Sequence, residues 1–481
     1  MKIKLGIFEF IFGAIFVLSL STDWYAPLIL ALFGTLIMLT MDNLGKAIVL
    51  REIMALHSCF VCLVMPLVGY IYFPSTNLMA RIWVRWMPIP IEEYFSYALP
   101  AIAGFIFALC WPLKNGRHAD YGTGLQNIMG RARLIVQEKA HLGVMLMIFG
   151  IITYEIRNFL PTALQFAFLL FFFAGFAGLM YVYFSKSFRY RKLALWLFFA
   201  FILITSVNSG MFTIEAYMGM TLLSFFFLGR KTRLWKKLSI AIVGIFLLMV
   251  VQMIKPAFRG KIWRGDYEGN KALLFANMFT DKLTNLDLES ADVFFPLYYR
   301  TNQGFNVAAV MRRFPRIRPY DDGANLGLAL VSAFVPRFLW PDKPEAGGKF
   351  NMKYYTGVTI VNFSTNVGPL GEGWGSFGSG GILFMIFLGF IIRLAYRQVF
   401  VIATKVPLLL FWIPLLFYQV TYSAETDTLQ IMNSLIKSAF FTYLLYKIKP
   451  ALFIAVRERL RRPRHSNPGL ANGNLQGGIA K

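Results

Sequence analysis

Arginine dominates the charge of one stretch of this sequence, RRFPRIRPYDDGANLGLALVSAFVPRFLWPDKP at residues 312–344. The stretch holds five arginines, one lysine and three aspartates in a chain that is otherwise mostly apolar. A guanidinium group is planar and always charged, and it can donate two parallel hydrogen bonds to one phosphate. The stretch therefore predicts a site for a phosphate or diphosphate group, with these candidate ligands: Arg312, Arg313, Arg318 and Arg337.

An ordinary charged surface is the alternative interpretation of the same arginines. Fifteen lysines and arginines between residues 255 and 378 stand beside eleven aspartates and glutamates, so salt bridges and contacts with lipid phosphates can account for any single one. Asp321 and Asp322 fit such salt bridges better than a metal site. For the cluster as a whole we favour the anion site, because arginines outnumber lysines in it.

A second stretch, NVGPLGEGWGSFGSGG at 366–381, surrounds Glu372 with glycines just before an apolar run. Glycine lets the backbone approach a ligand closely, and a carboxylate at a membrane edge is costly unless it is paired or functional. Two functional roles stay open for Glu372: a base for a sugar hydroxyl, or a partner that orients an arginine. The third interpretation is a turn in which Glu372 is simply solvated. Trp340 and Trp374 are candidate platforms for sugar rings, although aromatic side chains also form belts at membrane interfaces.

The composition places these residues in a polytopic membrane protein. The chain has 481 residues, of which 57% are hydrophobic, 17% aromatic and only 15% charged. A helix needs about 20 apolar residues to cross a bilayer, and about twelve runs come near that length. They are 5–21, 24–41, 53–73, 95–113, 141–160, 162–184, 192–211, 212–229, 237–254, 379–395, 398–420 and 428–447. The predicted fold class is therefore all-α.

Lysine and arginine are concentrated in alternate short loops, which sets the predicted orientation. With the N-terminus inside, the basic segments all fall on the inner side, and so does the C-terminus. These segments are 114–139, 185–192, 229–237 and 447–465. One long loop then lies outside, and long loops are exempt from this charge rule.

The chain divides accordingly into four parts. They are an N-terminal bundle of about nine helices (1–254), a large outer loop (255–378), C-terminal helices (379–447) and a basic, partly disordered tail (448–481). Within the loop, 324–341 is too short and too broken by glycine and proline for a span, and it predicts an interfacial or re-entrant helix. Arg259 and Arg264, where the chain enters the loop, are further candidate anion ligands.

Other kinds of chemistry find little support in the sequence. The net charge of +24 is accounted for by the basic inner loops, so nucleic acid is not an expected partner. All four histidines map to the inner side or its membrane edge, and no nucleotide-binding loop motif occurs. Cys59 and Cys62 lie in an apolar run, where they are small helix residues. Neither a metal ion nor a cofactor is expected.

The block PRFLWPDKP (336–344) and the stretch GEGWGSFGSGG (371–381) carry a family resemblance. In a chain with about a dozen spans and one large late outer loop, they resemble the Wzy-type polymerases of O-antigen and exopolysaccharide repeat units. The resemblance implies a GT-C-like glycosyltransferase of the bacterial inner membrane, with both termini cytoplasmic. It transfers a growing glycan from undecaprenyl diphosphate onto a new lipid-linked unit at the periplasmic face.

The resemblance also implies roles for the candidate residues. Arginines neutralise the diphosphate leaving group, so the expected catalytic residues are Arg312, Arg337 and Glu372. The expected substrate-binding residues are Arg259, Arg264, Arg313, Arg318, Trp340 and Trp374. The implied partners are the lipid-linked oligosaccharide, the bilayer, a chain-length regulator and a flippase.

Two other functions stay open. A flippase or transporter of lipid-linked oligosaccharides would show two matching halves with broken helices, and no such internal symmetry is visible. Another lipid-linked-sugar glycosyltransferase or ligase is the second alternative. If it depended on metal it would need early acids on the outer side, where Glu92 and Glu93 are the candidates.

Overall fold

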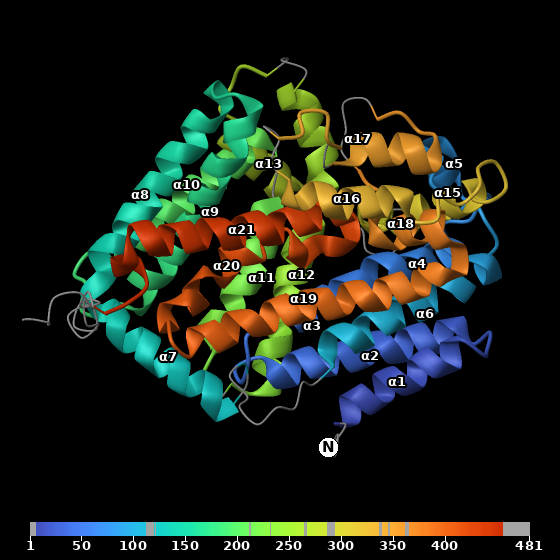
Figure 1. Ribbon diagram of the computed structural model, residues 1–481. Helices are drawn as coiled ribbons and strands as arrows, with labels where there is room; N and C mark the ends of the chain where they lie inside the picture. Colours follow the sequence, from blue (N-terminus) through green and yellow to red (C-terminus); the bar gives the residue numbers. More distant parts are fainter. Residues whose placement is uncertain are drawn as a thin grey trace, which may run out of the picture.

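Helices make up the regular structure of this protein (Figure 1). The computed structural model describes residues 6–111, 120, 122–210, 213–230, 232–263, 267–285, 294–335, 339–344, 347–360 and 365–455. Within these residues no β-strand occurs, so the all-α prediction is confirmed for them.

The helices of the N-terminal part are α1 (Ile7–Ser19), α2 (Tyr25–Asn43), α3 (Leu50–Cys59), η1 (Phe60–Val64), α4 (Met65–Tyr72), α5 (Leu78–Trp83), α6 (Ile91–Cys110), α7 (Gly122–Val136), α8 (Ala140–Ile156), α9 (Thr162–Phe184), α10 (Arg191–Ser209), α11 (Thr213–Phe227) and α12 (Leu234–Trp263). Those of the C-terminal part are α13 (Lys271–Thr284), α14 (Phe295–Thr301), α15 (Gly304–Arg313), α16 (Ala324–Phe334), α17 (Gly348–Asn351), η5 (Met352–Thr356), α18 (Gly368–Phe377), α19 (Gly381–Ala403), η7 (Pro407–Trp412), α20 (Ile413–Leu416), η8 (Val420–Glu425) and α21 (Thr428–Ile448).

Nine helical segments in the described part of the chain are long and apolar enough to cross a membrane. They are α2, α3 to α4, α6, α7 to α8, α9, α10, α12, α18 to α19 and η7 to η8. The protein is therefore a multi-pass membrane protein, whereas the count of twelve stays a prediction because α1, α11 and α21 are shorter or less apolar. We call the helix ends outer and inner after the predicted orientation.

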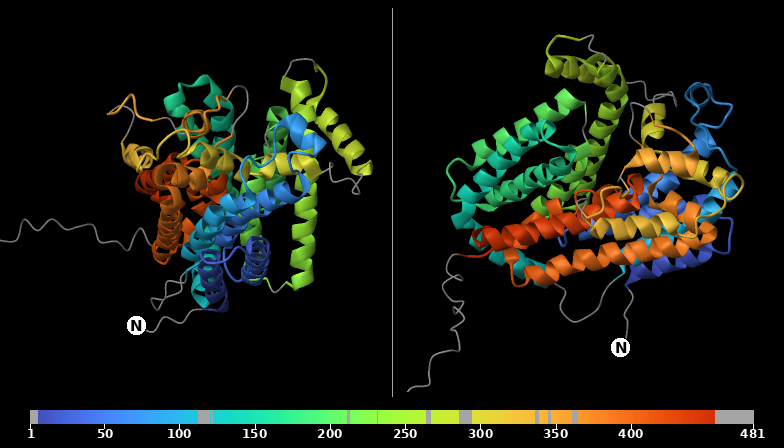
Figure 2. Two further views of the ribbon diagram at one scale, coloured as in Figure 1. Left: turned by 90° about the vertical axis from the view of Figure 1, so that its right-hand side faces the viewer. Right: turned by 45° about the horizontal axis from the view of Figure 1, so that its top comes forward.

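The bundle is built around α6 and the irregular η7–η8 segment. In these two segments 78% and 89% of the span is buried inside the protein. Both α1 and α19 pack along α6, while α8 and α9 form a second close pair. α12 and α13 stand on the other side of the molecule from α19 (Figure 2). α12 and the α18–α19 segment therefore lie in different parts of the molecule.

α18 and α19 form a helical hairpin joined by η6 (Gly378–Gly380), so the glycine-rich stretch is helical and not the turn that its glycines predict. The chain reverses at Gly378, which has a φ of 57°, and α19 returns beside α18. A Cβ on Gly381 would lie 2.7 Å from the Gly373 carbonyl oxygen, so glycine permits this approach. The predicted turn is wrong for 371–377 because packing outweighs the low helix propensity of glycine. α18 thus re-enters the bundle.

A helix is present within 324–341 as α16, which packs along α21, while its interfacial or re-entrant position in the membrane stays a prediction. Lys343 closes its C-terminal end, since Nζ donates to the carbonyl oxygens of Ser332 at 2.9 Å and Val335 at 2.7 Å. Carbonyls at a helix end lack partners within the helix and favour a cation. One lysine of the outer loop therefore serves a helix end.

Replacing Gly381 by alanine should destabilise the hairpin. The added Cβ would lie 2.5 Å from the Tyr97 hydroxyl and 2.6 Å from a backbone carbon of Gly373, and such overpacking costs about 1–3 kcal/mol. The measurement is the thermal unfolding midpoint of the purified protein in detergent. Gly244→Ala in α12 is the matched control, because no atom lies within 4 Å of its Cβ. Equal midpoints for both variants would contradict the close packing.

Candidate functional site

A small apolar core joins α15, η5 and α18 at the outer end. Its buried members are Val310, Phe314, Met352, Tyr355, Ile360 and Val367. Tyr355 packs closest to α18, since a Cβ on Gly375 would lie 2.5 Å from its ring. This core fixes α18, which carries Glu372, against α15, which carries Arg313.

Glu372 is buried inside this layer, with 3% of its surface exposed. Its Oε1 accepts a hydrogen bond from Asn351 Nδ2 at 2.7 Å. Its Oε2 accepts from the Thr428 backbone N–H at 2.9 Å and from the Thr428 hydroxyl at 2.5 Å. Among the described residues no lysine or arginine lies within 4.0 Å of this carboxylate. Glu372 therefore joins α17 and α21 to α18 through neutral donors and orients no arginine there.

Asp427 is a second buried carboxylate at the same helix end, with 1% of its surface exposed. Its Oδ1 accepts from the Gln430 backbone N–H at 2.6 Å and so caps α21. Its Oδ2 accepts from Asn366 Nδ2 and from the Gly347 backbone N–H, both at 2.8 Å. Burial raises the pKa of the Asp427 carboxyl, while these hydrogen bonds oppose that rise. Two carboxylates thus meet the positive end of one helix dipole.

Buried amides extend this arrangement toward α15. The Asn366 carbonyl oxygen accepts from Gln303 Nε2 at 2.7 Å and from Asn306 Nδ2 at 2.9 Å. We define the carboxylate–amide cluster as Gln303, Asn306, Asn351, Asn366, Glu372, Asp427 and Thr428. Of these residues, only Glu372 was predicted as a site residue from the sequence. The Asp-Thr pair before the last apolar run was the available signal, because aspartate is a preferred helix N-cap.

Two of the predicted anion ligands flank η5 on the outer side of this core. The Arg318 guanidinium lies 3.8 Å from the centre of the Tyr354 ring, and the Tyr354 hydroxyl donates to Asp321 Oδ2 at 3.2 Å. Arg313 reaches Gly357, where a Cβ would lie 2.5 Å from Nη1. Its Nε is buried and has no hydrogen-bond partner among the described residues. Arg313 and Arg318 therefore lie on the same side of this core, and we call these two residues with η5 the arginine layer.

The predicted salt bridges beside the arginines occur only in part. Arg316 Nη2 contacts both carboxylate oxygens of Glu93, at 2.8 and 2.9 Å. Arg312 is exposed on α15. Asp321 accepts from a neutral tyrosine, and within the described part of the chain no cation lies within 4.0 Å of it.

Arg259, a further candidate arginine, does not belong to this layer. Arg259 lies on α12, where Nε donates to the Gly210 carbonyl at 2.7 Å and the guanidinium stacks 4.5 Å from the Trp263 ring centre. α12 stands apart from α18 (Figure 2). Arg264 and Arg337 lie outside the described residues.

The two candidate tryptophans lie in different surroundings. Trp374 on α18 is half-buried, its indole N–H donates to the Phe314 carbonyl at 3.1 Å, and its ring meets the Tyr97 ring edge-on at 4.8 Å between centres. Trp340 is half-buried in the segment that follows α16. Phe314 lies in the segment that connects α15 to Arg318. Its hydrogen bond with Trp374 therefore holds Trp374 next to the arginine layer.

A group of three ionisable residues lies next to the cluster. Glu425 accepts from Arg300 Nη1 at 2.9 Å through Oε2, and its Oε1 lies 3.2 Å from His57 Nε2. Glu425 is two residues from Asp427, so one short segment carries both acids. His57 was predicted to lie on the inner side or at its membrane edge, without a role. The structure brings it to a carboxylate near the outer layer.

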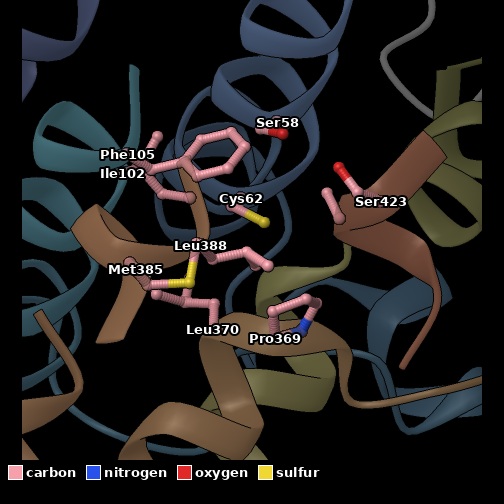
Figure 3. A pocket seen from close by; sticks show the side chains of 10 residues that line it. Ser58, Cys62, Ile102, Phe105, Pro369, Leu370, Met385, Leu388 and Ser423 are labelled. Carbon is pink, nitrogen blue, oxygen red and sulfur yellow. The ribbon is translucent and has the colours of Figure 1, made fainter. Parts of the chain in front are cut away.

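A small cavity lies behind the first turn of α18 (Figure 3). It is mostly apolar and has room for about one water molecule. Its lining residues are Ser58, Cys62, Ile102, Phe105, Pro369, Leu370, Met385, Leu388, Ser423 and Ala424. The cavity lies between the start of α18 and the helices α3, η1 and α6. Because Leu370 lines it and Glu372 follows two residues later, the cavity is next to the carboxylate–amide cluster.

Comparison with known families gives one result. A family described as a domain of unknown function, DUF8712, matches residues 7–398. The chain belongs to the DUF8712 family. The matched part includes Arg313, Arg318 and Glu372 and ends before Asp427 and Thr428. No curated protein and no solved structure matches the chain significantly, so the resemblance to Wzy-type polymerases stays a prediction.

Thr428→Val should destabilise the protein because it removes one hydroxyl donor from the buried Glu372 carboxylate. Leaving a buried acceptor without one of its hydrogen-bond donors costs about 1–3 kcal/mol. Thr421→Val is the matched control, since that buried hydroxyl donates only to the Phe417 carbonyl of its own turn. Equilibrium unfolding in mixed micelles measures both. A smaller loss for Thr428→Val than for Thr421→Val would contradict the role of this contact.

Proposed function

We propose that this protein polymerises undecaprenyl-diphosphate-linked oligosaccharide repeat units at the periplasmic face of the bacterial inner membrane. In this proposal it is a glycosyltransferase. It transfers the growing glycan from its lipid diphosphate to a new lipid-linked unit, with arginines stabilising the diphosphate that leaves.

The observation that carries the proposal is the layer formed by α15, η5 and α18. It combines Arg313 and Arg318, whose guanidinium groups flank η5, with Trp374 on the re-entrant helix. The buried Nε of Arg313 has no hydrogen-bond partner among the described residues, and a phosphate oxygen is a suitable acceptor for it. A charged layer at one end of a multi-pass bundle suits a substrate with a lipid tail, a diphosphate and a sugar.

The reaction defines what these residues must do. A hydroxyl oxygen of the acceptor unit forms a bond to the anomeric carbon of the donor glycan, and the bond from that carbon to the diphosphate oxygen breaks. The hydroxyl proton passes to a base or to the departing diphosphate. Fixed cations near the leaving oxygens stabilise the transition state, each by about 3–4 kcal/mol in favourable cases.

Glu372 takes a positioning role in this scheme. Its oxygens are occupied by Asn351 and Thr428, so it holds α18 in place and thereby Trp374. Asp321 is half-exposed: its Oδ2 accepts a hydrogen bond from the hydroxyl of Tyr354, whose ring carries Arg318, and its Oδ1 accepts one from the Gly323 backbone N–H. We therefore assign the base role to Asp321 before Glu372.

The test is the length of the surface polysaccharide in a strain that lacks the gene. The strain is complemented with wild type, Arg313→Gln, Arg318→Gln or Asp321→Asn at matched membrane levels. Each variant should lower the yield of long polymer by about 10²-fold or more and leave single repeat units on the cell surface. Arg316→Gln is the matched control, because this exposed arginine is already paired with Glu93, and it should keep long polymer.

Two results would contradict the proposal in different ways. Repeat units that accumulate on the inner side of the membrane in the deletion strain would make transport the function. Long polymer with both Arg313→Gln and Arg318→Gln would remove these arginines from the site.

A further inference from the structure

Arg393 on α19 is buried far from the arginine layer. Only 2% of its surface is exposed, and Nη2 has no hydrogen-bond partner among the residues that the structure describes. Its aromatic contact is distant, with 5.8 Å between the guanidinium carbon and the centre of the Phe390 ring. An arginine cannot lose its proton in a protein, so a buried guanidinium needs an acceptor from some source.

Buried lysines on the same inner side receive such acceptors from the chain. Lys139 donates to the carbonyl oxygen of Ala451, and Lys237 donates to those of Met41 at 2.6 Å and Leu44 at 2.5 Å. The fold therefore provides carbonyls to buried cations at this end. Arg393 departs from that pattern, which points to a partner outside the chain.

The depth of Arg393 follows from its neighbours. Gly389, one turn earlier on α19, packs against the end of α6: a Cβ there would lie 3.0 Å from the Ala108 Cβ. α6 ends at Cys110, and α3 begins at Leu50 next to Arg51. α19 runs along α6 past this point (Figure 1). Arg393 thus lies level with the inner ends of both helices.

A second arginine in the same place also lacks a full set of acceptors. Arg51 stacks 5.3 Å from the centre of the Tyr396 ring, and its Nη2 lies 3.7 Å from Asp120 Oδ2, beyond hydrogen-bond distance. Its Nε is buried without a hydrogen-bond partner in the described part of the chain. The charges that act on Arg393 are those of Arg51, Arg397 and Asp120.

The acids nearby do not satisfy these arginines. Glu52 acts on Arg51 from the same helix, but its Oε1 accepts from Asn43 Nδ2 at 2.8 Å. Apart from the 3.7 Å contact between Arg51 and Asp120, no described acid lies within 4.0 Å of Arg51 or Arg393. Three arginines therefore gather here with two acids nearby, Asp120 and Glu52, neither of which accepts a hydrogen bond from Arg51 or Arg393.

We propose that Arg51 and Arg393, with Arg397 at the edge, bind a phosphate group at the inner face of the protein. A phosphate oxygen can accept from Arg393 Nη2 and from Arg51 Nε, and both guanidinium groups suit its geometry. The phosphate belongs either to the headgroup of an inner-leaflet lipid or to a free phosphate ion. The site shares no residue with the outer arginine layer, so its test is independent of the test of the polymerase proposal.

Thermal unfolding of the full-length protein tests this site. The protein is exchanged into a phosphate-free glycoside detergent and titrated with inorganic phosphate, with dihexanoyl phosphatidylglycerol or with dihexanoylglycerol, which lacks phosphate. Chloride keeps the ionic strength constant. We expect the midpoint of wild type to rise by several degrees with a phosphate compound and to stay unchanged with dihexanoylglycerol. A rise with both phosphate compounds assigns a free anion site, and a rise with the lipid alone assigns a headgroup site.

Two variants and a control make the test specific. The rise should be lost in Arg393→Met and in Arg51→Gln, whose side chain is partly exposed and easier to replace. It should persist in Arg131→Gln, an exposed inner-face arginine that donates to the Thr404 carbonyl. Without phosphate, Arg393→Met should unfold at or above the midpoint of wild type, because it removes a buried charge without an acceptor.

Three results would overturn the proposal. One is a midpoint of wild type that neither phosphate compound raises. Another is an equal rise in wild type and Arg51→Gln. The third is a lower midpoint of Arg393→Met than of wild type without phosphate, which would mean that the chain itself supplies the partner of Arg393.

Discussion

The outer half of the molecule depends on how two buried carboxylates are neutralised at the start of α21. Glu372 and Asp427 are almost fully enclosed, and the donors that reach them are amides, backbone N–H groups and one hydroxyl. A buried polar group without a hydrogen-bond partner is costly, so these donors stabilise the outer half of the fold. The helix dipole of α21 adds a favourable field at the same point.

This requirement couples segments that are far apart in the sequence. Glu372 ties α18 to Asn351 of α17 and to Thr428 of α21, while Asp427 ties α21 to Asn366. The arginine layer lies on top of this arrangement through the packing of Tyr355 on Gly375. A rigid polar base beneath a charged outer layer is what preorganised binding requires, since positioning of charge in advance avoids reorganisation when a ligand arrives.

The sequence predicted the class of protein well and the site only in part. Hydrophobic runs and basic loops suffice for a multi-pass helical protein, because span length and charge asymmetry are local properties. α18 was missed, because glycine favours a helix only when tertiary packing demands close approach, as between Gly373 and Gly381. Arg313 and Arg318 were predicted, but their separation from Arg259 depends on how α12 packs, which no local pattern encodes.

Charge type alone therefore does not identify a ligand site in this protein; the test is whether the chain satisfies each buried charge. Lys343, predicted as part of a positive surface, closes α16 with two carbonyl contacts, and Arg316 is paired with Glu93. Buried acids at the outer end have full sets of donors, so they act as structure. Arg393 has burial like theirs without an acceptor for Nη2 among the described residues. Since burial is costly in both cases, the difference lies in where the compensation comes from, and for Arg393 we propose that a bound phosphate group supplies it.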